Sequence, residues 1–133
     1  MLEIPKGSFA DITLSLLRVV SGALFMQHGA QKLFAVLGRE EAVAVVSLMG
    51  LAGLLELVGG LAIVLGMYTR PVAFILSGEM ATAYFMAHFS RSFWPIMNRG
   101  ELPILYCFLF LFFVAAGGGS YSFDGLVGKK AAD

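Results

Sequence analysis

Residues 12–34 read ITLSLLRVVSGALFMQHGAQKLF, an apolar run long enough to cross a membrane. A helix that spans a hydrocarbon core of about 30 Å needs roughly 20 residues, at a rise of about 1.5 Å each. Asp11 stands directly before the run, as a typical helix N-cap residue does. Arg18 interrupts the run and no small-x-small cleavage site follows it. We therefore expect a retained span rather than a secretory signal peptide.

Three further apolar stretches follow, and polar breaks separate them. They cover residues 42–67, 72–89 and 102–118. The apolar part of the last stretch ends at Ala116, before three consecutive glycines, and is short for a full crossing. The pattern predicts an all-α membrane protein, a single domain over residues 1–133 that forms a bundle of four transmembrane helices. An even number of crossings places both termini on the same side of the membrane.

The composition agrees with a chain that is surrounded by lipid. Hydrophobic residues make up 59% of the sequence and charged residues only 14%, whereas soluble domains are about half apolar and about a quarter charged. The net charge is zero, which gives nucleic-acid binding no electrostatic basis. The single cysteine, Cys107, excludes an internal disulfide. The basic residues divide evenly between the two sides, so the positive-inside rule does not orient the chain.

Three ionisable residues, Arg18, Glu56 and Glu79, lie well inside three different predicted spans. Helical rise puts them at comparable depths of roughly 9, 15 and 12 Å from the terminal side. A charge near mid-bilayer costs at least ~2.5–3.5 kcal/mol, so such groups normally face inward and pair. We therefore predict a central polar site in which Arg18 binds one glutamate and shares its guanidinium with the other. Unless Lys32 or His28 reaches down, one glutamate then carries a proton at neutral pH.

This central polar site has two interpretations. A protonated glutamate can donate to a ligand carbonyl or carry a proton, which would make the cluster a functional site. Buried ion pairs also occur as clasps that fix the register of helices without doing chemistry. In either case we expect Glu56 in a helix–helix seam, because Gly53, Glu56 and Gly60 share one face of the second span. Small residues on that face allow another helix to approach closely.

A second polar group is expected at the far ends of the first and third spans and in the loop that follows. Its members, which we predict to line the mouth of the site, are His28, Lys32, Tyr84, His88, Asn98 and Glu101. Histidine, tyrosine and basic donors at one level can bind an anionic or quinone-like ring. The alternative is an interfacial belt, in which Trp94, Arg91 and Arg99 anchor the helices to head groups. No i, i+4 ligand pair supports a metal site.

Several short motifs follow one another along nearly the whole chain, and their order is more specific than any one of them. They are Arg18, His28-Gly29-x-x-Lys32-Leu33, Gly50-x-x-Gly53-x-x-Glu56-x-x-Gly59-Gly60, Leu65-Gly66-x-x-Thr69-Arg70, Met80, Ala83, His88-Phe89, Phe93-Trp94-Pro95, Asn98-x-Gly100-Glu101-Leu102 and Gly117-x-Gly119-x-Tyr121-Ser122-x-Asp124. With these motifs the chain resembles the DoxX family of small four-helix membrane proteins. The resemblance implies a multi-pass protein of the bacterial plasma (inner) membrane with both termini in the cytoplasm.

The resemblance also implies a redox association. Members of the family are described as subunits of quinone-linked thiosulfate oxidoreductases, or as partners of soluble oxidoreductases in oxidative-stress assemblies. We therefore expect a subunit or partner of a quinone-linked membrane system. Quinone is the expected cofactor, and the lipid bilayer, an oxidoreductase and a second copy of the chain are the expected partners. Two other functions stay open: a non-catalytic scaffold, chaperone-like or lipid-binding module, and a proton-coupled small-molecule transporter built as a homodimer.

Overall fold

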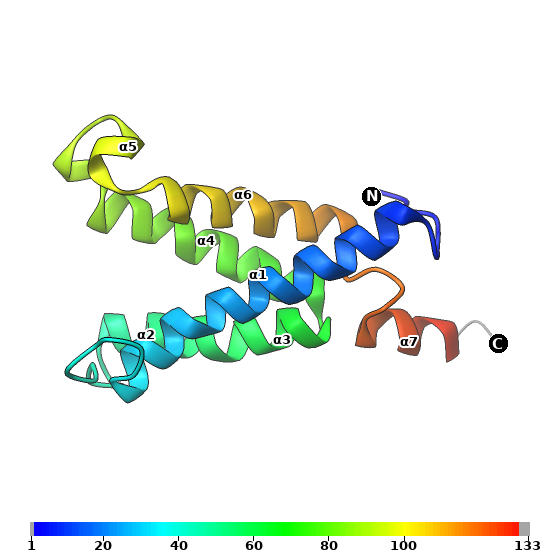
Figure 1. The fold of residues 1–133 in the computed structure, drawn as a ribbon, viewed down its shortest axis with the longest axis horizontal. Coiled ribbons are helices and arrows are strands. Elements are labelled where there is room, and N and C mark those ends of the chain that lie inside the picture. The colour runs from blue at the N-terminus through cyan, green and yellow to red at the C-terminus, as the bar shows by residue number, and fades with distance from the viewer. Residues whose placement is uncertain (1, 131–133) are drawn as a thin grey trace.

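The computed structural model describes residues 2–130, and the regular structure of this part of the chain is entirely helical (Figure 1). The elements are α1 (Phe9–Phe34), α2 (Leu48–Leu54), the π-helical turn η1 (Leu55–Gly59), α3 (Gly60–Leu65), α4 (Thr69–Ala87), the 3-10 turn η2 (Phe89–Arg91), α5 (Pro95–Asn98), α6 (Glu101–Ala116) and α7 (Phe123–Lys130). α2, η1 and α3 follow one another without a break. They form one helix over Leu48–Leu65, which we call the second helix.

Two antiparallel helix pairs build the body of the molecule (Figure 1). α1 packs along the second helix, and α4 packs along α6. The ring of Phe25 on α1 joins the pairs, because its centroid lies 5.1 Å from that of Tyr106 and 4.9 Å from that of Phe110, both on α6. The start of α1, the turn between α3 and α4, the end of α6 and α7 lie together at what we call the terminal end. The loop 35–47 and α5 lie at the opposite, far end.

α1 lies close to the second helix because glycines face each other across the contact. A Cβ atom at Gly22 would be 2.9 Å from the carbonyl oxygen of Gly60, and one at Gly29 would be 2.5 Å from that of Gly53. Both glycines of the second helix therefore face α1, and Glu56 between them is buried. This confirms the predicted seam, in which close backbone packing holds helices together in lipid.

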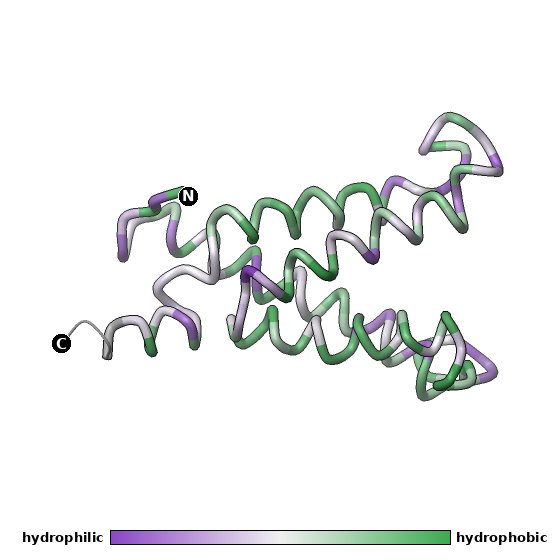
Figure 2. The backbone as a smooth tube through the Cα atoms, turned by 180° about the vertical axis from the view of Figure 1, so that it is seen from behind, coloured by the Kyte–Doolittle hydropathy of each residue, from purple (hydrophilic) through white to green (hydrophobic). Residues whose placement is uncertain are grey.

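The outer surface is apolar, as expected of a protein in a membrane. Within residues 2–130, three helices are long and apolar enough to cross a bilayer, and Glu101–Ala116 is apolar but shorter. Phe74 on α4 and Phe108 on α6 are each 66% exposed, which is unfavourable in water and favourable in lipid. Figure 2 shows hydrophobic residues along the helices and hydrophilic residues mainly toward their ends and in the loops.

The first two long helices begin where a serine caps them. Ser8 is the N-cap of α1 and accepts a hydrogen bond from the N–H of Asp11, so the prediction of Asp11 as the cap is wrong. Asp11 stands in the first turn instead. The second helix begins at Leu48 and not at 42, because Ser47 caps it. Such caps bind N–H groups that have no partner inside the helix.

The later helices also differ from the predicted spans. α4 covers Thr69–Ala87 rather than 72–89, and a short 3-10 turn follows it. α6 ends at Ala116 rather than 118, because Gly117 adopts a positive φ of 78° that ends the helix. α5 and α7 are additional helices that the apolar pattern does not predict. Both are short and lie outside the apolar runs.

Candidate functional site

Arg18 lies in the middle of α1 and is only 1% exposed. Its Nε donates to the carbonyl oxygen of Gly118 at 3.0 Å, and its Nη2 donates to that of Tyr121 at 2.8 Å. Its Nη1 donates to the carbonyl of Ile63 at 2.6 Å and to that of Val64. Ile63 and Val64 belong to the last turn of the second helix, where carbonyls lack the partner that a continuing α-helix would supply. The carbonyl of Ile63 also accepts the N–H of Gly66 at 3.1 Å. We call Arg18 and these four carbonyls the carbonyl clasp.

The predicted pairing of Arg18 with a glutamate is therefore wrong. Arg18 binds backbone carbonyls, and Glu56 pairs with Lys32 instead. Side chains on a helix lean toward the N-terminus of that helix. α1 and the second helix run antiparallel (Figure 1). The Arg18 side chain therefore leans toward the terminal end, where it meets Ile63 and Gly118, and the Glu56 side chain leans toward the far end, where it meets Lys32. The predicted depths were counted from the helical rise of the backbone, so they did not include the opposite directions in which the two side chains extend.

Lys32, Glu56 and Glu79 form a separate polar centre, which we call the acid–base cluster. The Nζ of Lys32 lies 2.5 Å from Oε1 of Glu56, and the two side chains are 17% and 4% exposed. Glu79, on α4, interacts electrostatically with both. Both carboxylate oxygens of Glu79, and Oε2 of Glu56, are buried without a hydrogen-bond partner in the described part of the chain. The cluster thus holds two carboxyl groups, one cation and unused hydrogen-bonding capacity.

The π-helical turn η1 carries Glu56. Turns of this kind interrupt an α-helix locally and occur often at functional sites. Gly29 on α1 faces η1, since a Cβ atom there would be 2.5 Å from the backbone nitrogen of Leu57. The missing side chain at Gly29 lets α1 approach, and Lys32, almost one turn further along α1, reaches Glu56. A glycine and a π turn thus place the ion pair, and α4 brings Glu79 to it.

At the far end, three of the predicted mouth residues come together. Asn98 is fully buried, and its Nδ2 donates to the hydroxyl of Tyr84 at 3.2 Å and to the carbonyl of Ser92 at 2.9 Å. Its Oδ1 accepts the N–H of Gly100 at 2.7 Å. The Nδ1 of His88 lies 2.9 Å from the carbonyl oxygen of Asn98. Tyr84 on α4 and two loop residues thus occupy the hydrogen-bonding groups of the Asn98 side chain, which fastens the loop to the end of α4.

The other predicted mouth residues lie elsewhere, so the six do not form one group. Lys32 belongs to the acid–base cluster. His28 packs edge-on against the ring of Tyr106, with 6.5 Å between centroids. Glu101 is exposed at the first residue of α6. Trp94 is 62% exposed, as in the interfacial belt that was the alternative reading of this region.

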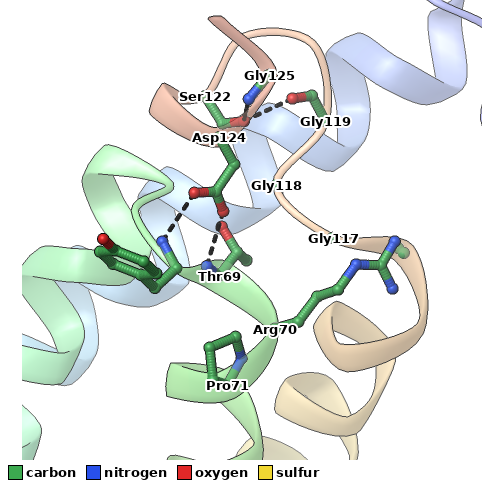
Figure 3. Close-up of a pocket in the computed structure, with 11 residues that line it drawn as sticks. Thr69, Arg70, Pro71, Gly117, Gly118, Gly119, Ser122, Asp124 and Gly125 are labelled. Carbon is green, nitrogen blue, oxygen red and sulfur yellow. Dashed lines mark hydrogen bonds between the residues drawn. The ribbon is translucent and has the colours of Figure 1, made fainter. Parts of the chain in front are cut away.

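Sequence reasoning missed the polar contacts that hold the terminal end together. Asp124, at the start of α7, accepts the N–H groups of Tyr68 and Thr69 at 2.8 Å each and so caps α4 (Figure 3). The Nη1 of Arg70 donates to two carbonyls in the last turn of α6, at 2.6 and 2.9 Å. The sequence signal for these contacts is that Arg70 and Asp124 both stand at helix ends, and that the glycines 117–119 lie shortly before Asp124. Helix ends carry backbone groups that need partners.

Comparison with known proteins places the chain among membrane proteins. The sequence model of the DoxX family matches residues 13–89, which include the whole acid–base cluster. An uncharacterized protein of Haemophilus influenzae is 42% identical over 124 residues, which cover 88% of this chain and 92% of the relative. The inner membrane protein YqjF of Escherichia coli K12 is 32% identical over 126 residues, which cover 90% and 95%. No solved structure matches the chain.

Proposed function

The chain belongs to the DoxX family of membrane proteins, and from this premise we propose that it is a membrane subunit of a quinone-linked redox system, with the acid–base cluster as its quinone site. The family resemblance supports the redox part of the proposal. One observation carries the ligand part: both oxygens of the Glu79 carboxyl are buried without a hydrogen-bond partner in residues 2–130. A buried polar group without a partner is unfavourable, and a bound ligand can supply that partner.

The cluster has the donors that a quinone ring needs. A quinone presents carbonyl oxygens, which accept hydrogen bonds, at the edge of an apolar ring. An anionic carboxyl without a partner is unfavourable in an apolar interior, so Glu79 is more stable there with a proton. In that form it donates a hydrogen bond to a ring oxygen. The ammonium group of Lys32 supplies a second donor beside it.

Each residue of the cluster has a distinct role in this proposal. Glu79 gives its proton to a ring oxygen during reduction and takes it back during oxidation. Lys32 stabilises the negative charge that develops on that oxygen, and Glu56 holds Lys32 in place through their 2.5 Å contact. Bound quinone supplies the redox chemistry: reduction takes two electrons from a partner oxidoreductase and two protons, one through Glu79 and one from water.

Quinone binding by the purified protein tests the proposal. Protein in neutral detergent is titrated with a short-chain ubiquinone or menaquinone analogue, and binding is measured by calorimetry. We expect Glu79→Met to weaken binding about tenfold, which corresponds to roughly one hydrogen bond. Glu79→Gln should keep much of the affinity, because an amide still donates, but should lose quinol-dependent turnover with the partner oxidoreductase. Glu101→Gln, an exposed carboxylate on α6, is the matched control and should behave as wild type.

Two results would contradict the quinone site. One is wild-type protein that binds no quinone and shows no quinol-dependent activity with or without candidate oxidoreductases. The other is quinone affinity that Glu79→Met and Glu101→Gln leave equally unchanged.

We further propose that α1, the second helix, α4 and α6 all cross the inner membrane, with both termini in the cytoplasm. α6 has 16 residues, about 24 Å of helix at ~1.5 Å per residue, and its apolar surface supports a crossing. Labelling with a membrane-impermeant thiol reagent, in a Cys107→Ser background, tests the orientation. Glu40→Cys at the far end should react in spheroplasts, and Lys6→Cys should react only after lysis. The reverse pattern would contradict the orientation.

A further inference from the structure

We propose that a cleft at the terminal end binds a phosphate group through the guanidinium of Arg70. The cleft lies between the start of α4 and the segment after α6, and its volume is about 430 Å³ (Figure 3). Its lining includes the glycines 117–119, Thr69, Arg70 and Asp124. None of these residues belongs to the acid–base cluster, so the inference is independent of the quinone proposal.

Arg70 presents an unoccupied edge to the cleft. Two carbonyl hydrogen bonds, at 2.6 and 2.9 Å, hold its Nη1 against the end of α6. Its Nε and Nη2 have no hydrogen-bond partner among the described residues. These two nitrogens form the edge with which arginine binds two oxygens of a phosphate or carboxylate at once. The side chain is therefore fixed on one side and free on the side that recognises an oxyanion.

Glycine at position 117 keeps this edge accessible. A Cβ atom at Gly117 would lie 3.1 Å from Nη2 and 3.3 Å from Nε of Arg70. Figure 3 shows Arg70 extending along Gly117 and away from Asp124. Asp124 uses both carboxylate oxygens to bind the N–H groups that open α4. The negative charge of the cleft is thus directed at α4 and not at the free edge of Arg70.

Thr69 supplies a second polar group that lacks a partner. Thr69 is fully buried, and its hydroxyl oxygen, Oγ1, has no hydrogen-bond partner in the described chain. A Cβ atom at Gly118 would lie 2.7 Å from this hydroxyl, so any larger residue at position 118 would press against it. A phosphate has oxygens enough to accept from the Arg70 edge and from Thr69 together. A buried hydroxyl without a partner is unfavourable until such an acceptor arrives.

The position of the cleft suggests two sources for the phosphate. α4 begins and α6 ends beside it, at the level where membrane helices meet lipid head groups. A phospholipid head group and a free phosphate ion share the chemistry that Arg70 and Thr69 recognise. The experiment therefore needs one arm for each.

Binding measurements on purified protein in neutral detergent test the inference. Native mass spectrometry counts bound phosphatidylglycerol, and equilibrium dialysis measures bound inorganic phosphate. We expect saturable binding in at least one arm, which identifies the source. Arg70→Lys keeps the charge but loses the two-nitrogen edge, and Thr69→Val removes the hydroxyl at nearly constant shape. Each should weaken that binding at least fivefold, while Arg91→Lys, on the exposed far-end turn, should match wild type.

The inference is overturned if neither ligand binds saturably, or if Arg70→Lys, Thr69→Val and Arg91→Lys bind alike. Thr69→Val keeps the test decisive even where Arg70→Lys fails to fold. It removes a group that has no hydrogen bond to lose within residues 2–130, so its unfolding temperature should stay at or above that of wild type.

Discussion

Arg18 and Lys32 are both cations on α1 that face the second helix, yet their surroundings differ in kind. Arg18 is enclosed by four backbone carbonyls in the carbonyl clasp. Lys32 meets one carboxylate, and beside that pair the two carboxyl oxygens of Glu79 lie buried without a hydrogen-bond partner in the described residues. In an interior of low dielectric a satisfied polar network rigidifies the fold, whereas an unsatisfied one awaits a partner. Unused hydrogen-bonding capacity, rather than depth in the membrane, separates the candidate site from the scaffold.

Arg18→Gln should have the largest effect on stability. The substitution removes the positive charge and at least two of the four hydrogen bonds, because a glutamine amide has only two N–H groups. Each bond to a charged group is worth about 1.5–3 kcal/mol, so we expect a loss of about 4 kcal/mol or more. Thermal unfolding and size-exclusion chromatography in detergent measure the effect. Arg91→Gln, an exposed arginine, is the control. Equal stability of the two variants would contradict the comparison, because it would show that the carbonyl clasp does not stabilise the fold.

Lys32→Gln should have the next largest effect. It leaves Glu56 buried without its cation, and breaking a buried ion pair from one side costs about 3–5 kcal/mol. Protonation of Glu56 relieves part of that cost, so we expect about 2–4 kcal/mol. The double variant Lys32→Gln with Glu56→Gln should recover at least ~1 kcal/mol, as expected of residues in contact. Additive losses in an unfolding titration with sodium dodecyl sulfate would show that the two side chains do not interact.

Asn98→Ala should lower stability moderately and leave ligand binding unchanged. It deletes the bonds to Tyr84, Ser92 and Gly100 at the far end, and buried groups left without a partner cost about 1–3 kcal/mol each. Met97→Ala, at an exposed neighbour, controls for the loss of side-chain volume. The comparison is sharpened if Asn98→Ala lowers the unfolding temperature without changing quinone affinity. A loss of affinity at unchanged stability would assign Asn98 to the site.

Glu79→Met should have the smallest effect on stability and a large one on binding. The carboxyl has no hydrogen bond to lose within the described chain, and methionine has nearly the same length. We expect stability within about 1 kcal/mol of wild type, or above it. The quinone affinity should fall about tenfold in the same preparation. A variant that unfolds like Arg18→Gln would show that Glu79 is part of the scaffold.

The sequence predicts the helices better than it predicts their ends. Apolar length is sufficient to locate α1, the second helix and α4, because a span in lipid needs a continuous apolar stretch. The starts depend on Ser8 and Ser47, whose capping role follows from local backbone geometry. α7 is short and mixed in composition, and its place is set by the contact of Asp124 with α4. No periodic pattern of apolar residues in the sequence indicates a short helix such as α7.

The buried charges were predictable, but their partners were not. Arg18 and Glu56 are buried, as expected of charges within apolar runs. The partners of Arg18 are backbone carbonyls, which every residue possesses, so no side-chain pattern identifies them. The pairing of Lys32 with Glu56 depends on the opposite lean of side chains on antiparallel helices. The direction in which each side chain extends along its helix, and not the depth of its Cα atom, determined the partners of Arg18 and of Lys32.

The carbonyl clasp joins α1 to the segment after α6, and the ribosome synthesises these two parts of the chain several seconds apart. Arg18 binds Gly118, which is 100 positions later in the chain, and Tyr121, which is 103 positions later. At about 5–20 residues per second, synthesis of the two sides is separated by about 5–20 s. During that interval α1 carries an incompletely bound guanidinium, and translation of the last segment completes its coordination. A chain that stops before residue 118 therefore leaves Arg18 without two of its four carbonyl partners.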